Sequence, residues 1–155
     1  MSKVEPIPSE HSPVLAYLVV KDAARAIDFY KAAFGAVEAF RLTEPSGKVG
    51  HAELSINGGM FMLADEYPDF GALSPPSIGG CPIKLHVYVA DADAAVARAL
   101  AAGATLVRAA KDEFYGDRAG TVADPFGYSW SLHSRIENVT PAEMQRRWSE
   151  MMGAA

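Results

Sequence analysis

The strongest constraint on the fold of this chain is an internal duplication. The first half contains the segment PVLAYLVVKD at 13–22 and the second half contains PIKLHVYVAD at 82–91, and a helical pattern ending in Gly-Ala follows each. The landmark pairs are 68 or 69 residues apart: Asp22 and Asp91, Gly35 and Gly103, Gly59 and Gly127. Such an offset indicates a duplicated supersecondary unit. We expect the two copies to pack about a pseudo-twofold axis and to share a groove that holds the functional site.

Each copy is predicted to be a β-α-β-β-β unit. In the first copy, the apolar stripe between the N-cap Asp22 and the stop at Gly35 predicts a helix over 23–34. Turn signals and β-rich runs predict four strands in each copy and a matching second helix. The predicted strands are 14–20, 37–42, 49–56, 60–64, 84–89, 105–109, 120–123 and 128–133, and the second helix covers 92–102. A capping box at Thr140 predicts a last helix that reaches about Met152.

These elements divide the chain into five parts. The predicted parts are an N-terminal arm (1–12), a first module (13–64), a linker (65–81), a second module (82–135) and a C-terminal helical extension (136–155).

The composition excludes several classes of protein. The net charge is -5 and no basic run is present, which argues against a nucleic-acid partner. No apolar run approaches the ~18 residues of a membrane span, and the N-terminus lacks an apolar signal core. Cys81 is the sole cysteine, so an intramolecular disulfide is excluded. We therefore expect a cytoplasmic protein.

Three features together resemble the vicinal oxygen chelate superfamily, which includes glyoxalase I, extradiol dioxygenases and fosfomycin- and bleomycin-resistance proteins. They are the paired modules, the segment from Val20-Lys-Asp22 to the Ala26–Tyr30 stretch, and the turn Asp124-Pro-Phe-Gly127. The segments 51–56, 114–118 and 140–144 look like the PhnB-like branch. The resemblance implies an α+β fold of two βαβββ modules that form a cup-shaped curved sheet, and it implies a homodimer.

The family enzymes hold a divalent metal in the cup through histidines and glutamates near the first and last strands. The matching positions here are Leu15, Lys84, Ser131 and a residue near Leu63. Leucine cannot ligate a metal, and an ammonium at Lys84 would repel a cation. We therefore expect no tightly bound metal at the usual family site, and no cofactor.

Strand alternation predicts which side chains face the cup. Tyr17 and Tyr88 supply aromatic surface there, and Arg118 in the loop 115–118 is placed at the rim, where it could clamp an anion. The polar residues expected to converge in the cup are Arg41, His51, Glu53, Lys84, His86, Ser131 and His133.

The leading hypothesis is a protein of the bleomycin-resistance type that binds a small molecule in this cup without a metal. One alternative is a lyase, isomerase or related enzyme that uses Lys84 and His86 in acid–base catalysis, or a divalent metal relocated to His51, Glu53 and His86. A second alternative is an interaction protein with an empty cup. The sequence contains no Ser-His-Asp motif, P-loop or dinucleotide fingerprint.

Overall fold

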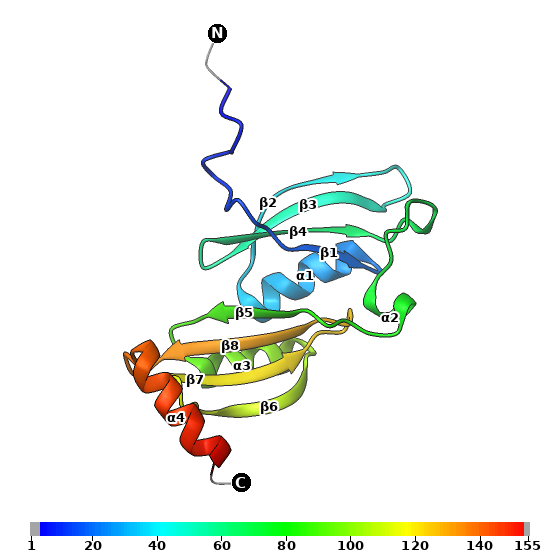
Figure 1. Ribbon diagram of the computed structural model, residues 1–155. Coiled ribbons are helices and arrows are strands. Elements are labelled where there is room, and N and C mark those ends of the chain that lie inside the picture. Colours follow the sequence, from blue (N-terminus) through cyan, green and yellow to red (C-terminus); the bar gives the residue numbers. More distant parts are fainter. Residues whose placement is uncertain (1–3, 154–155) are drawn as a thin grey trace.

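The computed structural model describes residues 4–153 and shows the predicted duplication (Figure 1). Residues 1–3 of the predicted arm and residues 154–155 of the predicted extension lie outside the described residues. The first module contains β1 (Tyr17–Val20), α1 (Ala23–Phe34), β2 (Val37–Thr43), β3 (Val49–Ile56) and β4 (Gly59–Asp65). The second contains β5 (Lys84–Tyr88), α3 (Ala92–Ala102), β6 (Thr105–Asp112), β7 (Asp117–Ala123) and β8 (Ser129–Arg135).

The two modules share one strand order. The first sheet runs β1-β4-β3-β2 and the second runs β5-β8-β7-β6, with one parallel pair and two antiparallel pairs in each. Even the register repeats: Tyr17 lies opposite Met62 in the first sheet, and His86 lies opposite Ser131 in the second. The duplication predicted from the sequence is therefore confirmed, and the fold is α+β with two βαβββ modules.

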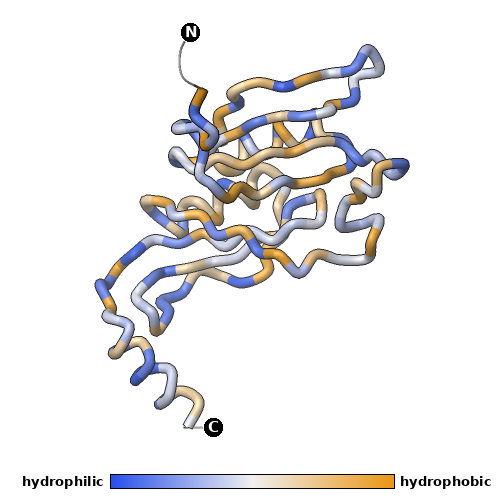
Figure 2. The backbone as a smooth tube through the Cα atoms, turned by 45° about the horizontal axis from the view of Figure 1, so that its top comes forward, coloured by the Kyte–Doolittle hydropathy of each residue, from blue (hydrophilic) through white to orange (hydrophobic). Residues whose placement is uncertain are grey.

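The linker and the C-terminus contain helices. A 3-10 turn, η1 (Pro68–Phe70), and a short helix, α2 (Pro75–Ile78), interrupt the segment that was predicted to be a plain linker. The C-terminal helix α4 (Pro141–Gly153) follows β8 and is mainly hydrophilic (Figure 2). Trp148 of α4 packs on Phe114, with ring centroids 5.5 Å apart. No helix among residues 4–153 is long and apolar enough to cross a membrane.

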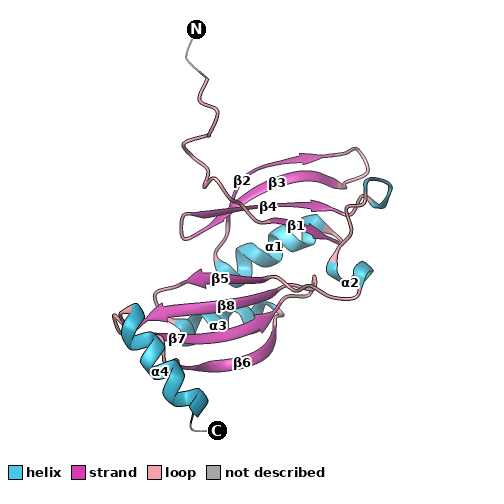
Figure 3. Cartoon of the chain, in the orientation of Figure 1, coloured by secondary structure: helices cyan, strands magenta, loops and turns pink. Residues whose placement is uncertain are grey.

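One apolar core joins the modules. Helices α1 and α3 pack against each other beside the two sheets (Figure 3), and the helix-facing side chains of both sheets enter the same cluster. The ring of Trp130 lies 5.2 Å from that of Tyr30 and 5.7 Å from that of Phe61, measured between centroids. Because the helix-facing surfaces meet in this core, the opposite surfaces of the two sheets face away from it.

Candidate functional site

The second module carries a buried polar network on the sheet face opposite α3. Ser131 and His133 lie two residues apart on β8, and Asp117 begins the neighbouring strand β7. The Ser131 hydroxyl lies 2.8 Å from Nε2 of His133, and Nδ1 of His133 lies 3.2 Å from a carboxylate oxygen of Asp117. His133 and Asp117 are only 2% and 1% exposed. This burial implies that the three groups depend on one another for hydrogen bonds.

Aromatic side chains surround this network. Tyr88 on β5 donates its hydroxyl hydrogen to Asp117 at 3.0 Å, and the ring of His86 stacks on that of His133 at a centroid distance of 4.6 Å. The ring of Tyr115 lies 6.1 Å from His133. Parallel pairing of β5 with β8 places His86 opposite Ser131 and Tyr88 opposite His133. The predicted residues Lys84, His86, Tyr88, Ser131 and His133 thus lie on two neighbouring strands.

The electrostatic environment of His86 is positive. Burial is the largest cause of a lowered pKa for this imidazole, followed by His133 and then by the cationic groups of Lys84 and Arg108. The carboxylate of Asp117 acts in the opposite direction but more weakly. His86 is therefore biased toward the neutral form, in which it can accept a proton or a hydrogen bond.

We predict that His86 titrates below the ordinary histidine pKa of 6.5 in the folded protein. As the pH falls, the unfolded chain takes up this proton before the folded chain does, so His86 lowers the stability of the fold below about pH 6.5. An NMR titration of the histidine ring protons measures the pKa directly. Lys84→Met removes one of the charges that lower the pKa of His86, so this pKa should rise in the variant. If His86 titrated at the ordinary histidine pKa in both proteins, the positive environment assigned to it would be wrong.

The first module carries a different polar cluster on its own outer face. The Tyr17 hydroxyl lies 2.9 Å from Nδ1 of His51, and Nε2 of His51 lies 3.4 Å from Glu53. His11, which precedes β1, approaches the other oxygen of Glu53 at 3.3 Å. Burial raises the pKa of Tyr17. The arm therefore contributes one residue to this cluster, which the sequence did not indicate.

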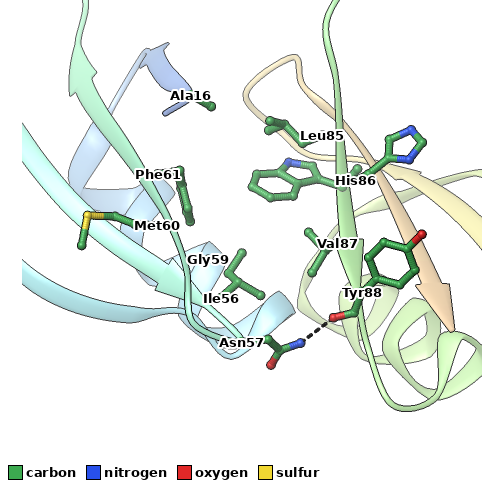
Figure 4. A pocket seen from close by; sticks show the side chains of 11 residues that line it. Ala16, Ile56, Asn57, Gly59, Met60, Phe61, Leu85, His86, Val87 and Tyr88 are labelled. Atoms are coloured by element: carbon green, nitrogen blue, oxygen red, sulfur yellow. Dashed lines mark hydrogen bonds between the residues drawn. The ribbon is translucent and has the colours of Figure 1, made fainter. Parts of the chain in front are cut away.

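The structure does not bring the two clusters together within one chain. Figure 4 shows the cleft between the modules, where Leu85 and Val87 point inward, while His86 and Tyr88 point away on one side and Met60 on the other. This cleft has a volume of about 300 Å³ and is lined mainly by apolar side chains. The convergence of His51 and Glu53 with the second-module residues on one concavity, as predicted from the duplication, is therefore wrong for a single chain.

Two arginines lie away from the predicted cup. Arg41 pairs in register with buried Ala52, and its guanidinium binds Glu38 at 2.9 Å, so it lies on the helix-facing side of β2. The cause is a register irregularity between Glu38 and Phe40, which reverses the alternation after that point. Arg118 binds Asp93 of α3 at 2.9 Å, which places it on the helix side of β7. Neither arginine is therefore part of the candidate site.

The residues present do not fit the metal of the family enzymes. Leu63, named from spacing, is fully buried in the core, and the outward-facing residue beside it is Met62, which pairs with Glu53. Ser131 bonds to His133, and Lys84 offers an amino group near His86 in place of an imidazole ligand. Among residues 4–153, no three His, Cys, Asp or Glu side chains are placed to hold a metal ion. His86 lies beside His133, so the alternative set of His51, Glu53 and His86 is not assembled in one chain.

Several residues of the second-module site were not predicted. Asp117 was placed in the loop 115–118, whereas it begins β7 and anchors His133. Thr121 lies 3.4 Å from the Ser131 hydroxyl, Arg108 lies on β6, and Tyr115 lies in the turn between β6 and β7. Strand alternation applied to a β7 that starts at Asp117 would have found Asp117 and Thr121, since both share a face with the outward positions of β8.

Comparison with known proteins identifies the class that this fold and site define. Residues 12–132 match the family model of the Glyoxalase/Bleomycin resistance protein/Dioxygenase superfamily. The chain belongs to this superfamily. It is 48% identical over 149 residues to "Uncharacterized protein Rv0887c" of Mycobacterium tuberculosis, an alignment that covers 94% of this chain and 84% of that protein.

Solved structures agree with the assignment. The Arabidopsis thaliana At5g48480 gene product is 31% identical, has a TM-score of 0.64 and covers 78% of this chain and 97% of its own. TioX from Micromonospora sp. ML1 is 27% identical, with a TM-score of 0.62 and coverage of 81% and 99%. A PhnB protein from Bacillus cereus is 21% identical, with a TM-score of 0.61 and coverage of 79% of this chain and 99% of its own; at this identity it shows the fold alone.

Proposed function

We propose that the protein binds a small molecule bearing a carboxylate, phosphonate or enolisable carbonyl on the outer face of the second module, without the usual family metal. The observation that carries this proposal is the position of Lys84, two residues before His86 on the same face of β5; Lys84 and Arg108 both lower the pKa of that imidazole. Tyr88 and Tyr115 supply aromatic walls on the same face, and family membership supplies the precedent of a cup that receives small molecules.

The charged groups close to the site decide whether it prefers an anionic or a cationic ligand. The chain as a whole carries a net charge of -5, which would favour a cation. Surface charges more than roughly 10 Å away are screened at ordinary salt concentration, however, so the nearby groups dominate. The carboxylate of Asp117 is already occupied by Tyr88, His133 and Arg135. Arg108 already lies 3.7 Å from the Glu113 carboxylate, so Lys84 is the cation near His86 that favours an anionic or electron-rich group.

A homodimer would complete the cup. The outer faces of the two modules diverge within one chain, and Phe40 and Leu42 on the first face are 44% and 60% exposed. Both pair in register with residues of the first polar cluster, Glu53 and His51. A second copy could place its first-module face over the second-module face of this chain, which would bury these apolar groups and enclose the ligand. Light scattering coupled to gel filtration tests the dimer, and a monomer at working concentrations would contradict it.

We predict that Lys84→Met weakens the binding of phenylphosphonate, used as a probe, by about tenfold or more. This is the loss expected when a charge-assisted hydrogen bond worth ~1.5–3 kcal/mol is removed. Calorimetric titration of both proteins measures the effect. Lys48→Met is the matched control, because Lys48 lies in the turn between β2 and β3, over the ring of Tyr67 and outside the second-module site. Absence of probe binding to the wild-type protein, or equal affinity for folded Lys84→Met, would contradict the proposal.

The competing function is an enzyme that acts through Lys84 and His86 or through a metal. The lowered pKa of His86 would suit a general base at neutral pH. Metal analysis of protein purified without added metal separates the metal-dependent form of this alternative from the proposal. We expect less than stoichiometric zinc, nickel, iron and manganese; a stoichiometric ion would favour a metalloenzyme.

A further inference from the structure

Ser131, His133 and Asp117 form a hydrogen-bonded chain with a defined direction. The carboxylate of Asp117 can only accept, so Nδ1 of His133 carries the proton when the imidazole is neutral. Nε2 is then free to accept the hydrogen of the Ser131 hydroxyl at 2.8 Å. These are the same atoms and roles that activate serine in acyl-transfer enzymes, where the arrangement is recognised by geometry and not by sequence order.

Ligand binding does not require this arrangement. Asp117 is held from three sides, because Tyr88 donates to Oδ2 at 3.0 Å and Arg135 donates to Oδ1 at 3.3 Å, in addition to the contact with His133. These bonds fix the carboxylate and keep the imidazole oriented toward Ser131. Ser131 also lies on the outer sheet face, opposite His86 in register, and not in the apolar core. The hydrogen-bonded series therefore ends at a hydroxyl that is only 4% exposed, on the sheet face that we propose binds the small molecule.

We propose that Ser131 is an activated nucleophile that accepts the acyl group of a small ester on the outer face of the second module. The Ser131 oxygen forms a bond to the carbonyl carbon, and its proton passes to Nε2 of His133. The bond from the carbonyl carbon to the leaving oxygen then breaks, and that oxygen takes the proton from His133. Water hydrolyses the acylated serine by the reverse route, giving its proton to His133 and returning the hydroxyl hydrogen to Ser131.

The surroundings of Ser131 can stabilise the negative charge that develops during this attack. The hydroxyl of Thr121 lies 3.4 Å from that of Ser131 and comes from the neighbouring strand β7. Lys84 and Arg108 contribute positive charge near His86, which faces Ser131 across the β5–β8 pair. Hydrogen-bond donors and cations fixed near a developing oxyanion are a main source of rate enhancement in acyl transfer.

A fluorophosphonate probe tests the inference on the intact protein. The serine oxygen displaces fluoride at phosphorus, so the protein gains the phosphonyl group and loses one proton. We expect one phosphonyl group per chain, located on Ser131 by peptide mapping of the wild-type protein. His133→Gln should slow labelling by about a hundredfold or more, the usual contribution of a general base. Hydrolysis of p-nitrophenyl acetate should fall in parallel.

Ser129→Ala is the matched control, since Ser129 lies on the same face of β8 two residues earlier and pairs with Lys84. We expect this variant to label at the wild-type rate and Ser131→Ala to remain unlabelled. Circular dichroism verifies that each variant is folded. Locating the phosphonyl group on the wild-type protein tests the inference even if a variant fails to fold. The inference is overturned if the wild-type protein stays unlabelled, if the phosphonyl group is on another residue, or if Ser131→Ala labels equally. Binding of phenylphosphonate without labelling would retain the proposed binding function and reject the nucleophile.

Discussion

Asp124→Ala is expected to destabilise the protein by about 3–5 kcal/mol, because each buried donor left unpaired costs about 1–3 kcal/mol. The carboxylate of Asp124 accepts hydrogen bonds from the Tyr30 hydroxyl at 2.7 Å and from the Trp130 indole at 2.8 Å. It also accepts the backbone N–H groups of Phe126 and Tyr128. Tyr30 belongs to the first module and Trp130 to the second, so the substitution weakens the connection between them. A thermal melt should show a fall of about 10 °C in the midpoint.

Asp91→Ala provides the comparison for this variant. Asp91 is an exposed N-cap whose side chain accepts one backbone hydrogen bond, from Ala94 at 3.0 Å. Losing such a cap costs about 1 kcal/mol, which corresponds to a much smaller shift. Tyr30→Phe in the Asp124→Ala background should cost little more, since the partner of the hydroxyl is already gone. Equal melting temperatures for the two aspartate variants would refute a special role for Asp124.

Gly116→Ala is expected to destabilise the second module and disturb the candidate site together. Gly116 has a φ of 92°, and a Cβ there would lie 2.5 Å from the carbonyl oxygen of Glu137 and 2.8 Å from Cγ2 of Val139. Its own carbonyl accepts the N–H groups of Ile136 and Glu137, so the backbone has little room to move away. We expect a loss of more than about 2 kcal/mol, since overpacking alone typically costs 1–3 kcal/mol. Chemical denaturation measures this loss.

Gly103→Ala separates backbone strain from the steric clash. Gly103 also has a positive φ, 113°, but no atom lies within 4 Å of a Cβ placed there. The left-handed conformation alone costs a non-glycine residue roughly 1–2 kcal/mol. Gly116→Ala should exceed this value and should also shift the NMR signals of His133, because Gly116 lies between Tyr115 and Asp117. If both variants lose the same stability and His133 is unaffected, the close approach at Gly116 is unimportant.

The sequence was sufficient to predict the family and the fold, because both depend on repeated local signals. Asp22 and Gly35 bound the first helix, and the corresponding Asp91 and Gly103 bound the second, as the structure shows. Helix caps and alternating strands are short-range properties of the chain, so they can be recognised without a structure. The 68-residue offset then predicted that both halves share one strand order.

The candidate site was less predictable, because it depends on register and on how the sheets face. The irregularity after Glu38 reverses the side of Arg41, and nothing in the local sequence indicates it. The side chains that bond to Asp117 lie on β8 and β5, 16 or more residues away in sequence. They can be identified only when the pairing of the strands is known. Periodicity places a side chain on one face of a strand, but it does not say which face of another sheet lies opposite.

The aromatic core shared by the modules has a consequence for the way the chain unfolds. A protein made of two similar halves could lose its structure one half at a time, as repeat arrays do when neighbouring units are weakly coupled. Here Trp130 of one half packs directly on Tyr30 and Phe61 of the other. Separating the halves would expose these rings to water, so each half depends on the other for its own core. Unfolding should be a single cooperative transition, and a gene encoding one half alone should yield an unstructured polypeptide.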